Sequence, residues 1–258
     1  MAILGANNFK IYIPTLDEEN LIGYTIAALL KVFPPEMIEV IDLESDDSTI
    51  SRIPKGIKVH VEPLPKNVLS RVARRAFTDI KNKYTKKQEW VLWVDGDEVY
   101  PTHVLRQMRA WLEAAIAGEH DKKCLRVYWK ILDQREDGLY ISKEYLAAGP
   151  KLFNSNYFGF RRSWPEEVIE ALTDEYNSGD KWEFNGIWFY HGVLLQRSHL
   201  EKTVRRKKAV AKRTKYLKYL TFEKMTKSPW TFEATTPKKW ELLNMVEGSE
   251  DKKWAGEL

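Results

Sequence analysis

The chain has 258 residues, of which 43% are hydrophobic and 30% are charged, and it carries a net charge of +4. This length suits one large α/β domain or a domain with an elaborated end, and the composition argues against disorder over most of the chain. The single cysteine, Cys124, excludes an internal disulfide and a zinc–thiolate cluster. No secretory signal and no apolar stretch long enough to cross a membrane are recognisable, so we expect a soluble, cytoplasmic protein.

Apolar runs alternate with helical patterns through the first half of the chain. The predicted strands are Phe9–Ile13, Ile38–Leu43, Ile57–Val61 and Trp90–Val94, and the predicted helices are Glu18–Val32, Asn67–Tyr84 and Thr102–Ala117. Short, continuous apolar strands separated by helices are typical of a parallel sheet that is buried on both faces. The sequence therefore predicts an α/β fold of the doubly wound kind.

The second half does not alternate in this way. It contains the predicted strands Cys124–Leu132 and Ile187–Tyr190 and the predicted helices Val168–Leu172 and Leu200–Leu220. We expect one packed unit in three parts: a nucleotide-binding half over residues 1–120, a substrate-binding half over 121–200, and a basic helical extension over 201–258.

The strongest chemical signal is the run Trp-Val-Leu-Trp-Val-Asp-Gly-Asp-Glu over residues 90–98. A buried parallel strand delivers Asp95 and Asp97 at its carboxyl end, where open α/β sheets bind ligands. We expect Gly96 to let the backbone turn so that both carboxylates face one point. Two carboxylates suit Mg²⁺ or Mn²⁺, with phosphate oxygens completing the coordination. The alternative is an ordinary acidic loop.

Two earlier strands also end in polar groups. Residues 11–20 and 41–49 each run from a strand into a turn rich in carboxylates, hydroxyls and backbone amides. Such groups can bind a base and a ribose, although Asp47 and Ser48 could equally cap a helix.

These three segments, in this order and spacing, resemble the family 2 glycosyltransferases with the GT-A fold. The resemblance is carried by Ile-Pro-Thr-Leu-Asp-Glu-Glu, Asp-X-X-Ser-X-Asp-X-Thr and Trp-Val-Asp-Gly-Asp-Glu, and it covers residues 9–101. It implies a mostly parallel sheet flanked by helices and the transfer of a hexose or pentose from a nucleotide sugar, most commonly a UDP-sugar, to a hydroxyl with inversion. The family often has Asn where Asp17 stands and an acid where Leu43 stands.

The resemblance also implies roles for single residues in the first half. The base and ribose are expected to lie against Pro14, Thr15, Glu18 and Asp42. Asp95 is expected near the ribose and the metal, and Asp97 as a direct ligand of Mn²⁺ or Mg²⁺. Arg71, on the helix before the metal strand, stands where the family often has a basic residue that reaches the diphosphate, and Arg74 and Arg75 are weaker candidates for the same role.

The acceptor half resembles the family over Lys151-Leu152-Phe153, Tyr157-Phe158-Gly159-Phe160 and Trp164-Pro165-Glu166-Glu167. An inverting transfer needs a carboxylate that takes the proton of the acceptor hydroxyl. Glu167 fits the pattern best, Glu166 is one residue away, and Asp174 is a further alternative. Trp164 and Tyr157 are the candidate acceptor-binding aromatic residues.

His191 stands at a predicted strand end, directly before Gly192. Several members of the family use such a histidine as a further metal ligand, and a neutral imidazole suits Mn²⁺. Arg197 follows it and is a candidate contact for a phosphate.

Nine lysines and arginines fall between residues 201 and 220, against one acid. Such a localised basic segment, Lys202–Lys218, indicates an anionic partner. It could also be a solvated helix that covers the core. It could lie on an anionic membrane and serve a cell-envelope glycan or lipid-linked acceptor. It could instead follow the phosphates of a phage-type modified DNA whose flipped, hydroxymethylated pyrimidine is the acceptor.

Two other classes of function remain open. The chain could be a nucleic-acid-binding protein built on a degenerate, inactive glycosyltransferase fold. It could also be a metal-dependent nucleotidyltransferase, since these enzymes also use paired carboxylates, but no Gly-rich phosphate loop follows the first strand.

Overall fold

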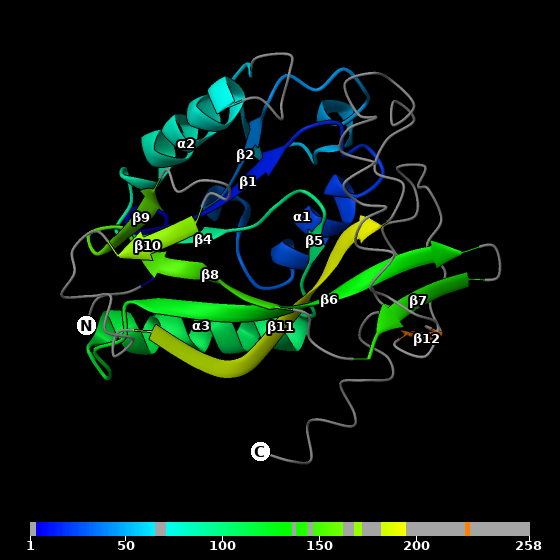
Figure 1. Cartoon of the computed structure of the whole chain (residues 1–258). Coiled ribbons are helices and arrows are strands. Elements are labelled where there is room, and N and C mark those ends of the chain that lie inside the picture. Colours follow the sequence, from blue (N-terminus) through cyan, green and yellow to red (C-terminus); the bar gives the residue numbers. More distant parts are fainter. Residues whose placement is uncertain are drawn as a thin grey trace.

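The computed structural model describes residues 4–64, 71–135, 138–143, 147–161, 168–171, 182–194 and 225–227. Its main element is one large sheet with helices on both faces (Figure 1). The predicted α/β fold with a sheet flanked by helices is therefore confirmed. No helix in the described part of the chain is long and apolar enough to span a membrane.

The first half forms the parallel part of the sheet. Its strands lie side by side in the order β4 (Trp90–Trp93), β1 (Phe9–Thr15), β2 (Ile38–Asp42) and β3 (Lys58–Val61). The three helices are α1 (Ile22–Leu30), α2 (Arg71–Thr85) and α3 (Thr102–Ala117), with short 3-10 turns η1 (Pro35–Met37) and η2 (Ile50–Arg52). All the strands and helices predicted in this half are present.

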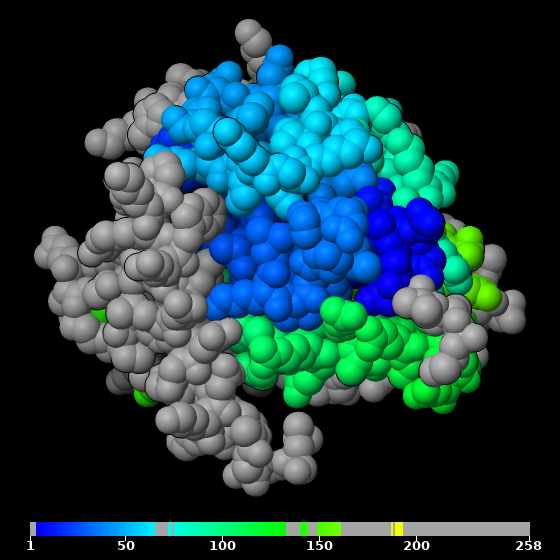
Figure 2. All heavy atoms as spheres, turned by 180° about the vertical axis from the view of Figure 1, so that it is seen from behind, coloured from blue at the N-terminus to red at the C-terminus, as the bar shows by residue number. Residues whose placement is uncertain are grey.

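The two faces of the sheet are covered by different helices (Figure 1). Alternate side chains of β1 point to opposite faces, as the strand period requires. Ile11 packs in the cluster that contains α1 and α3 residues, whereas Tyr12 packs with Ile80 and Tyr84 of α2. Figure 2 shows the molecule from the side that α1 and α3 cover. The blue residues near the N-terminus lie above a green band, which is α3.

The second half extends the sheet mainly with antiparallel strands. They are β6 (Cys124–Arg135), β7 (Gly138–Ser142), β8 (Ala147–Asn154), β11 (Trp182–Leu194) and β12 (Met225–Lys227). The short strand β5 (Glu98–Val99) of the first half joins them. Strand β8 pairs antiparallel with both β4 and β6, and β11 runs parallel to β6 and antiparallel to β5. The parallel arrangement implied by the sequence is thus confined largely to the first half.

One predicted element of this half is wrong. The segment predicted as a helix at Val168–Leu172 instead forms β10 (Val168–Ala171), which pairs antiparallel with β9 (Phe158–Arg161) in a separate two-stranded sheet. So short a segment gains little from helical hydrogen bonds alone, and the neighbouring strand offers it partners instead. The predicted helix Leu200–Leu220 lies outside the described residues.

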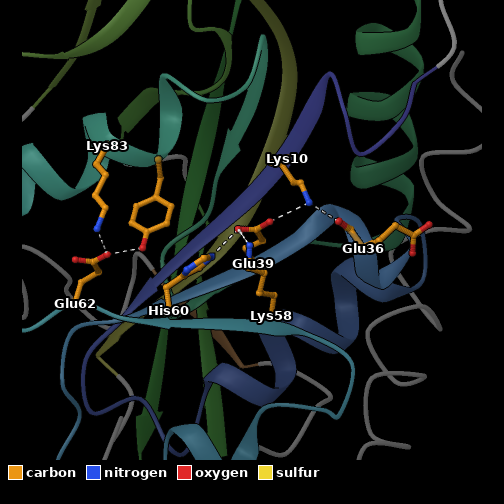
Figure 3. A network of polar contacts seen from close by, with 8 residues as sticks. Lys10, Glu36, Glu39, Lys58, His60, Glu62 and Lys83 are labelled. Carbon is orange, nitrogen blue, oxygen red and sulfur yellow. Dashed lines mark hydrogen bonds and ion pairs between the residues drawn. The ribbon is translucent and has the colours of Figure 1, made fainter.

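A polar network around Glu39 joins β1, β2 and β3 at the edge of the sheet, and a separate contact between Lys83 and Glu62 links α2 to the chain after β3 (Figure 3). The buried carboxylate of Glu39 lies 3.0 Å from Lys10 Nζ and 2.7 Å from His60 Nε2, and Lys58 Nζ is 3.7 Å away. Lys10 Nζ also donates to the carbonyl oxygen of Glu36 at 2.6 Å. Burial favours the neutral acid, but the hydrogen bonds and charges of His60, Lys10 and Lys58 prevail and lower the pKa of Glu39.

We expect Glu39→Gln to destabilise the fold by about 1–3 kcal/mol at neutral pH, because Lys10 and His60 lose their shared anion. A lowered pKa in the folded state stabilises the fold above the ordinary value of the group, and this contribution is lost as the pH falls through the folded-state pKa. The difference between wild type and variant should therefore shrink as the pH falls below about 4.

Urea unfolding at several pH values measures this difference. Glu36→Gln is the matched control, because Glu36 contributes only its backbone carbonyl to the network and its side chain is exposed. A constant difference between wild type and Glu39→Gln down to pH 3 would show that the carboxylate does not carry the effect.

Candidate functional site

The acidic segment Asp95–Glu98 lies where the chain leaves β4, next to the loop that follows β1. Gly96 N donates to Pro14 O at 3.1 Å, so the backbone segments that continue β4 and β1 stay paired beyond the end of β4. Strands β1 and β2 end opposite each other at Thr15 and Asp42. The carboxyl ends of three parallel strands therefore meet at one edge of the sheet, which is where α/β proteins bind ligands.

Gly96 is required by close packing rather than by a left-handed turn. The described glycines with positive φ are Gly56 and Gly118, so Gly96 is not among them. A Cβ atom at Gly96 would lie 2.9 Å from Thr15 Oγ1 and 3.2 Å from Glu18 Cγ. Gly96 does lie in a turn, in which Glu98 N donates to Asp95 O at 3.0 Å. Its missing side chain also lets the acidic segment lie against the loop after β1.

Asp97 and His191, which are far apart in the sequence, meet at this edge. Asp97 Oδ2 lies 3.4 Å from His191 Nε2, and the Asp97 side chain is only 2% exposed. The contact is set by the backbone, because Glu98 of β5 pairs with His191 of β11 and Gly192 N donates to Asp97 O at 2.7 Å. A carboxylate and an imidazole side by side are a suitable pair of ligands for Mn²⁺.

The imidazole of His191 lies near the carboxylates of Asp97, Glu98 and Asp95. Burial alone would lower the pKa of His191, but the charge and hydrogen bond of Asp97, with Glu98 and Asp95 behind it, raise the pKa above its ordinary value. Within the described ranges, no three His, Cys, Asp or Glu groups form a ready-made metal cluster. An ion held by Asp97 and His191 would need further oxygens from a ligand, as a diphosphate could supply.

Asp95 is held by Lys151 and Glu98. The sequence placed Lys151 in the pattern of the acceptor half and gave Glu98 no role of its own. Lys151 Nζ lies 2.5 Å from Glu98 Oε1 and 3.3 Å from Asp95 Oδ2. The other oxygen of Glu98 accepts from Asp95 N at 3.1 Å and from the hydroxyl of Tyr100 at 3.3 Å. The side chain of Asp95 is nevertheless 43% exposed, so its carboxylate is open to a ligand.

The charges of this cluster determine how its acids ionise. Burial would raise the pKa of Asp95, but Lys151 and Lys81 lower it below its ordinary value. Glu98 is more deeply enclosed, and there burial outweighs Lys151 and raises the pKa to about 7. The pKa of Lys151 is raised because the charges of Asp95 and Glu98 outweigh burial.

The loops after β1 and β2 are interlocked by hydrogen bonds between side chains and backbone. Asp17 N donates to Ser45 Oγ at 2.9 Å and Glu18 N donates to Thr49 Oγ1 at 2.7 Å. In return, Asp46 N donates to Asp17 Oδ1 at 2.8 Å. These bonds tie the two loops together, and α1 begins at Ile22, after them, rather than at Glu18 as predicted.

Two of the buried residues expected at a nucleotide, Asp42 and Thr15, differ in whether their polar atoms are already hydrogen-bonded. Asp42 is fully buried and both its oxygens accept from Ser45, at 3.0 and 2.6 Å, so it shapes the loop. Thr15 Oγ1 is also buried and has no hydrogen-bond partner among the described residues. An unpaired buried hydroxyl is unusual, and this one lies against Gly96.

Both loops also contain a non-glycine residue with positive φ. Asp17 has φ 52° and Glu44 has φ 65°. Such a conformation is uncommon outside glycine and costs about 1 kcal/mol or more. Strain of this kind at a ligand-binding edge of a sheet is a further indication that these loops are shaped for function.

Other residues expected at the site are placed elsewhere or lie outside the described residues. Tyr157 follows Asn154, which pairs with Trp90 at the start of β4, so it lies at the opposite end of that strand from Asp95 and is not brought to the site. For Arg71 only the helical backbone is described. The candidates outside the described residues are Trp164, Glu166, Glu167, Asp174, Arg197 and the segment Lys202–Lys218.

Comparisons with known proteins give no family match. No protein-family model matches the sequence, and no curated protein matches it. Among solved structures, S. aureus TarS 1-349 is 18% identical, with a TM-score of 0.46 over 72% of this chain and 60% of that chain. Glucosyl-3-phosphoglycerate synthase from Mycobacterium tuberculosis, in complex with Mn²⁺, UDP and glucosyl-3-phosphoglycerate, is 19% identical, with a TM-score of 0.36 over 48% of this chain and 44% of that chain. This chain thus spans 60% or less of the length of either structure.

Proposed function

We propose that the chain is a metal-dependent glycosyltransferase of the GT-A type, which transfers a sugar from a nucleotide sugar, a UDP-sugar in the first instance, to an acceptor hydroxyl. The observation that carries this proposal is the meeting of Asp97 with His191 beside the exposed carboxylate of Asp95, at the carboxyl end of β4. The motif order along the sequence supports it independently.

The donor site in this proposal lies between the acidic segment and the loops after β1 and β2. Pro14 and Thr15 are in direct contact with this segment, and the free hydroxyl of Thr15 is a donor for the nucleotide. Glu18 and Asp42 complete this side, Asp42 by holding its loop in shape. Asp95 accepts from the ribose, and Arg71 and Arg197 neutralise the diphosphate.

Asp97 and His191 are the residues that would hold Mn²⁺ or Mg²⁺. The ion, when bound, stabilises the negative charge that develops on the departing diphosphate. The chain's own contribution is to fix both ligands through the pairing of β5 with β11. Glu167, or its neighbour Glu166, takes the proton of the acceptor hydroxyl on the face of the sugar opposite the leaving group, and the transfer therefore inverts the anomeric carbon.

The acceptor is proposed to bind the half of the chain between residues 121 and 200, with Trp164 stacking on it. It is either a hydroxymethylated pyrimidine of phage-type modified DNA or a cell-envelope glycan or lipid-linked sugar. The basic segment Lys202–Lys218 suits both, because DNA and anionic membranes present rows of phosphates.

Calorimetric titration of UDP, GDP and CDP, each with Mn²⁺ and with EDTA, tests the donor site. We expect one nucleotide, UDP, to bind at least 10-fold more tightly with Mn²⁺. Glu113→Gln is a control variant, since Glu113 is an exposed acid of α3 that pairs with Arg109 of the same helix. Binding of no nucleotide would contradict the proposal and favour an inactive transferase fold that binds an anionic partner.

The acceptor is then tested with the matching nucleotide sugar. Hydroxymethylated DNA and lipid-linked glycans are offered separately, and the mass of each product is measured. A mass increase of one sugar on either acceptor supports transfer and identifies the acceptor class. Hydrolysis of the donor without transfer to either would exclude both acceptors.

A further inference from the structure

Lys151 stands in an unusual place for a lysine. It lies on β8 one residue before Leu152, which pairs with Leu92 of β4, so its side chain reaches the point where β4 ends. That side chain is only 11% exposed. Its Nζ lies 5.3 Å from the centre of the Phe189 ring, which itself stacks on Tyr100 at 4.8 Å. The ammonium group is therefore fixed by rings as well as by charges.

Lys151, Glu98 and Asp95 form a closed ring of contacts. Lys151 Nζ contacts the carboxylates of both Glu98 and Asp95, and the second oxygen of Glu98 accepts from the backbone N–H of Asp95. Asp95 is consequently held at two points, its amide by Glu98 and its carboxylate by Lys151. The carboxylate remains partly exposed while its orientation is restricted.

A buried lysine–carboxylate pair is an expensive way to stabilise a fold. Removing both charges from water costs several kcal/mol per ion, and apolar replacements of similar volume are often as stable or more stable. Three acids, Asp95, Asp97 and Glu98, also lie within one short segment, where they repel one another unless a cation is near. Lys151 offsets that repulsion at the place where a ligand is expected.

We propose that Lys151 is a positioning residue of the donor site: it orients the Asp95 carboxylate and offsets the repulsion among the three acids, so that a metal–nucleotide complex can bind. This inference rests on the proposed function. A purely structural role for Lys151, as the counter-ion of the buried Glu98, is the alternative that an experiment must separate from it.

Two variants separate these roles. Lys151→Met leaves the buried Glu98 without its counter-ion and should lower both stability and donor binding. Lys151→Met combined with Glu98→Gln removes the pair as a unit, and stability should recover. If Lys151 positions Asp95, the double variant should still bind UDP with Mn²⁺ at least 10-fold more weakly than wild type, because nothing restores the hold on the carboxylate.

Lys10→Met is the matched control. Lys10 is also a largely buried lysine paired with a buried glutamate, Glu39, but at the opposite end of β1 from Thr15 (Figure 3). This variant should lose stability and bind UDP with Mn²⁺ as wild type does. Each protein is titrated with UDP in Mn²⁺ and in EDTA, and its unfolding by urea is measured in parallel.

The outcomes distinguish this inference from the proposed function. If wild type binds UDP with Mn²⁺ and the double variant binds it equally well, Lys151 has only a structural role and the inference is wrong. If the double variant regains stability but not binding, the inference is supported. If wild type itself binds no nucleotide, the proposed function fails and the inference fails with it.

Discussion

Asp97→Asn should abolish metal-dependent nucleotide binding and sugar transfer while leaving the fold intact. The amide has the size of the carboxylate but no negative charge, so the proposed ion loses its anionic protein ligand and His191 loses the partner 3.4 Å away. Loss of a residue that merely supports a metal ligand costs about 10–100-fold in affinity or activity, so loss of the ligand itself should exceed this. Asp97→Ala should have the same effect on transfer.

Two measurements check this result. Calorimetry should show no difference between Mn²⁺ and EDTA for UDP binding to Asp97→Asn, and urea unfolding should stay within about 1–2 kcal/mol of wild type, since shape is conserved. Glu113→Gln, an acid-to-amide change on the exposed side of α3, should alter neither. Full transfer activity in Asp97→Asn or Asp97→Ala would show that the metal assignment is wrong.

The parallel half of the fold could be predicted because its signals are local. Continuous apolar runs that alternate with helices, such as Trp90–Val94, predict buried strands. The structure has strands at the predicted positions in this half. The second half depends on which strands become neighbours. Val168–Leu172 carries a pattern compatible with a helix, but the presence of β9 beside it makes it a strand, and no local pattern states this.

The residues of the candidate site also fall into those that a local pattern predicts and those that depend on strand pairing. The acids of the β4 loop could be found from the sequence, because a strand end followed by carboxylates is a local pattern. The contribution of Lys151 could not, because it follows from the antiparallel pairing of β8 with β4. The same pairing carries Tyr157 to the far end of β4, although Tyr157 and Lys151 are close in the sequence. The direction of β8 relative to β4, rather than residue type, decides that Lys151 and not Tyr157 reaches Asp95.

The sequence explains only part of the role of Gly96. The sequence suggests that glycine lets the backbone turn, and Gly96 does lie in a turn. The structure adds that a Cβ atom at Gly96 would lie only 2.9 Å from Thr15 Oγ1. Two loops from different strands are therefore pressed together, and the free hydroxyl of Thr15 lies at their contact. The geometry of the donor site depends on this contact.

Gly96→Ala should therefore destabilise the protein by about 1–3 kcal/mol, as overpacking of a closely packed region does. The added Cβ would lie 2.9 Å from Thr15 Oγ1 and 3.2 Å from Thr15 Cβ, so the loop after β1 must move away from the acidic segment. Binding of UDP with Mn²⁺ should weaken as well, because Asp95 and the nucleotide loops are no longer held at the same separation. Urea unfolding and calorimetry measure the two effects.

A matched glycine and a compensating change test the cause. At Gly149, in β8, an added Cβ would meet Trp129 Cζ3 at 3.4 Å, which is an ordinary contact, so Gly149→Ala should change stability by no more than about 0.5 kcal/mol. Combining Gly96→Ala with Thr15→Ala removes the hydroxyl in the closest contact and should restore part of the lost stability, since contacting residues are not additive. The double variant should not regain full nucleotide binding, because it lacks the Thr15 hydroxyl. Equal stability of Gly96→Ala and wild type would show that the close approach of the two loops does not constrain this site.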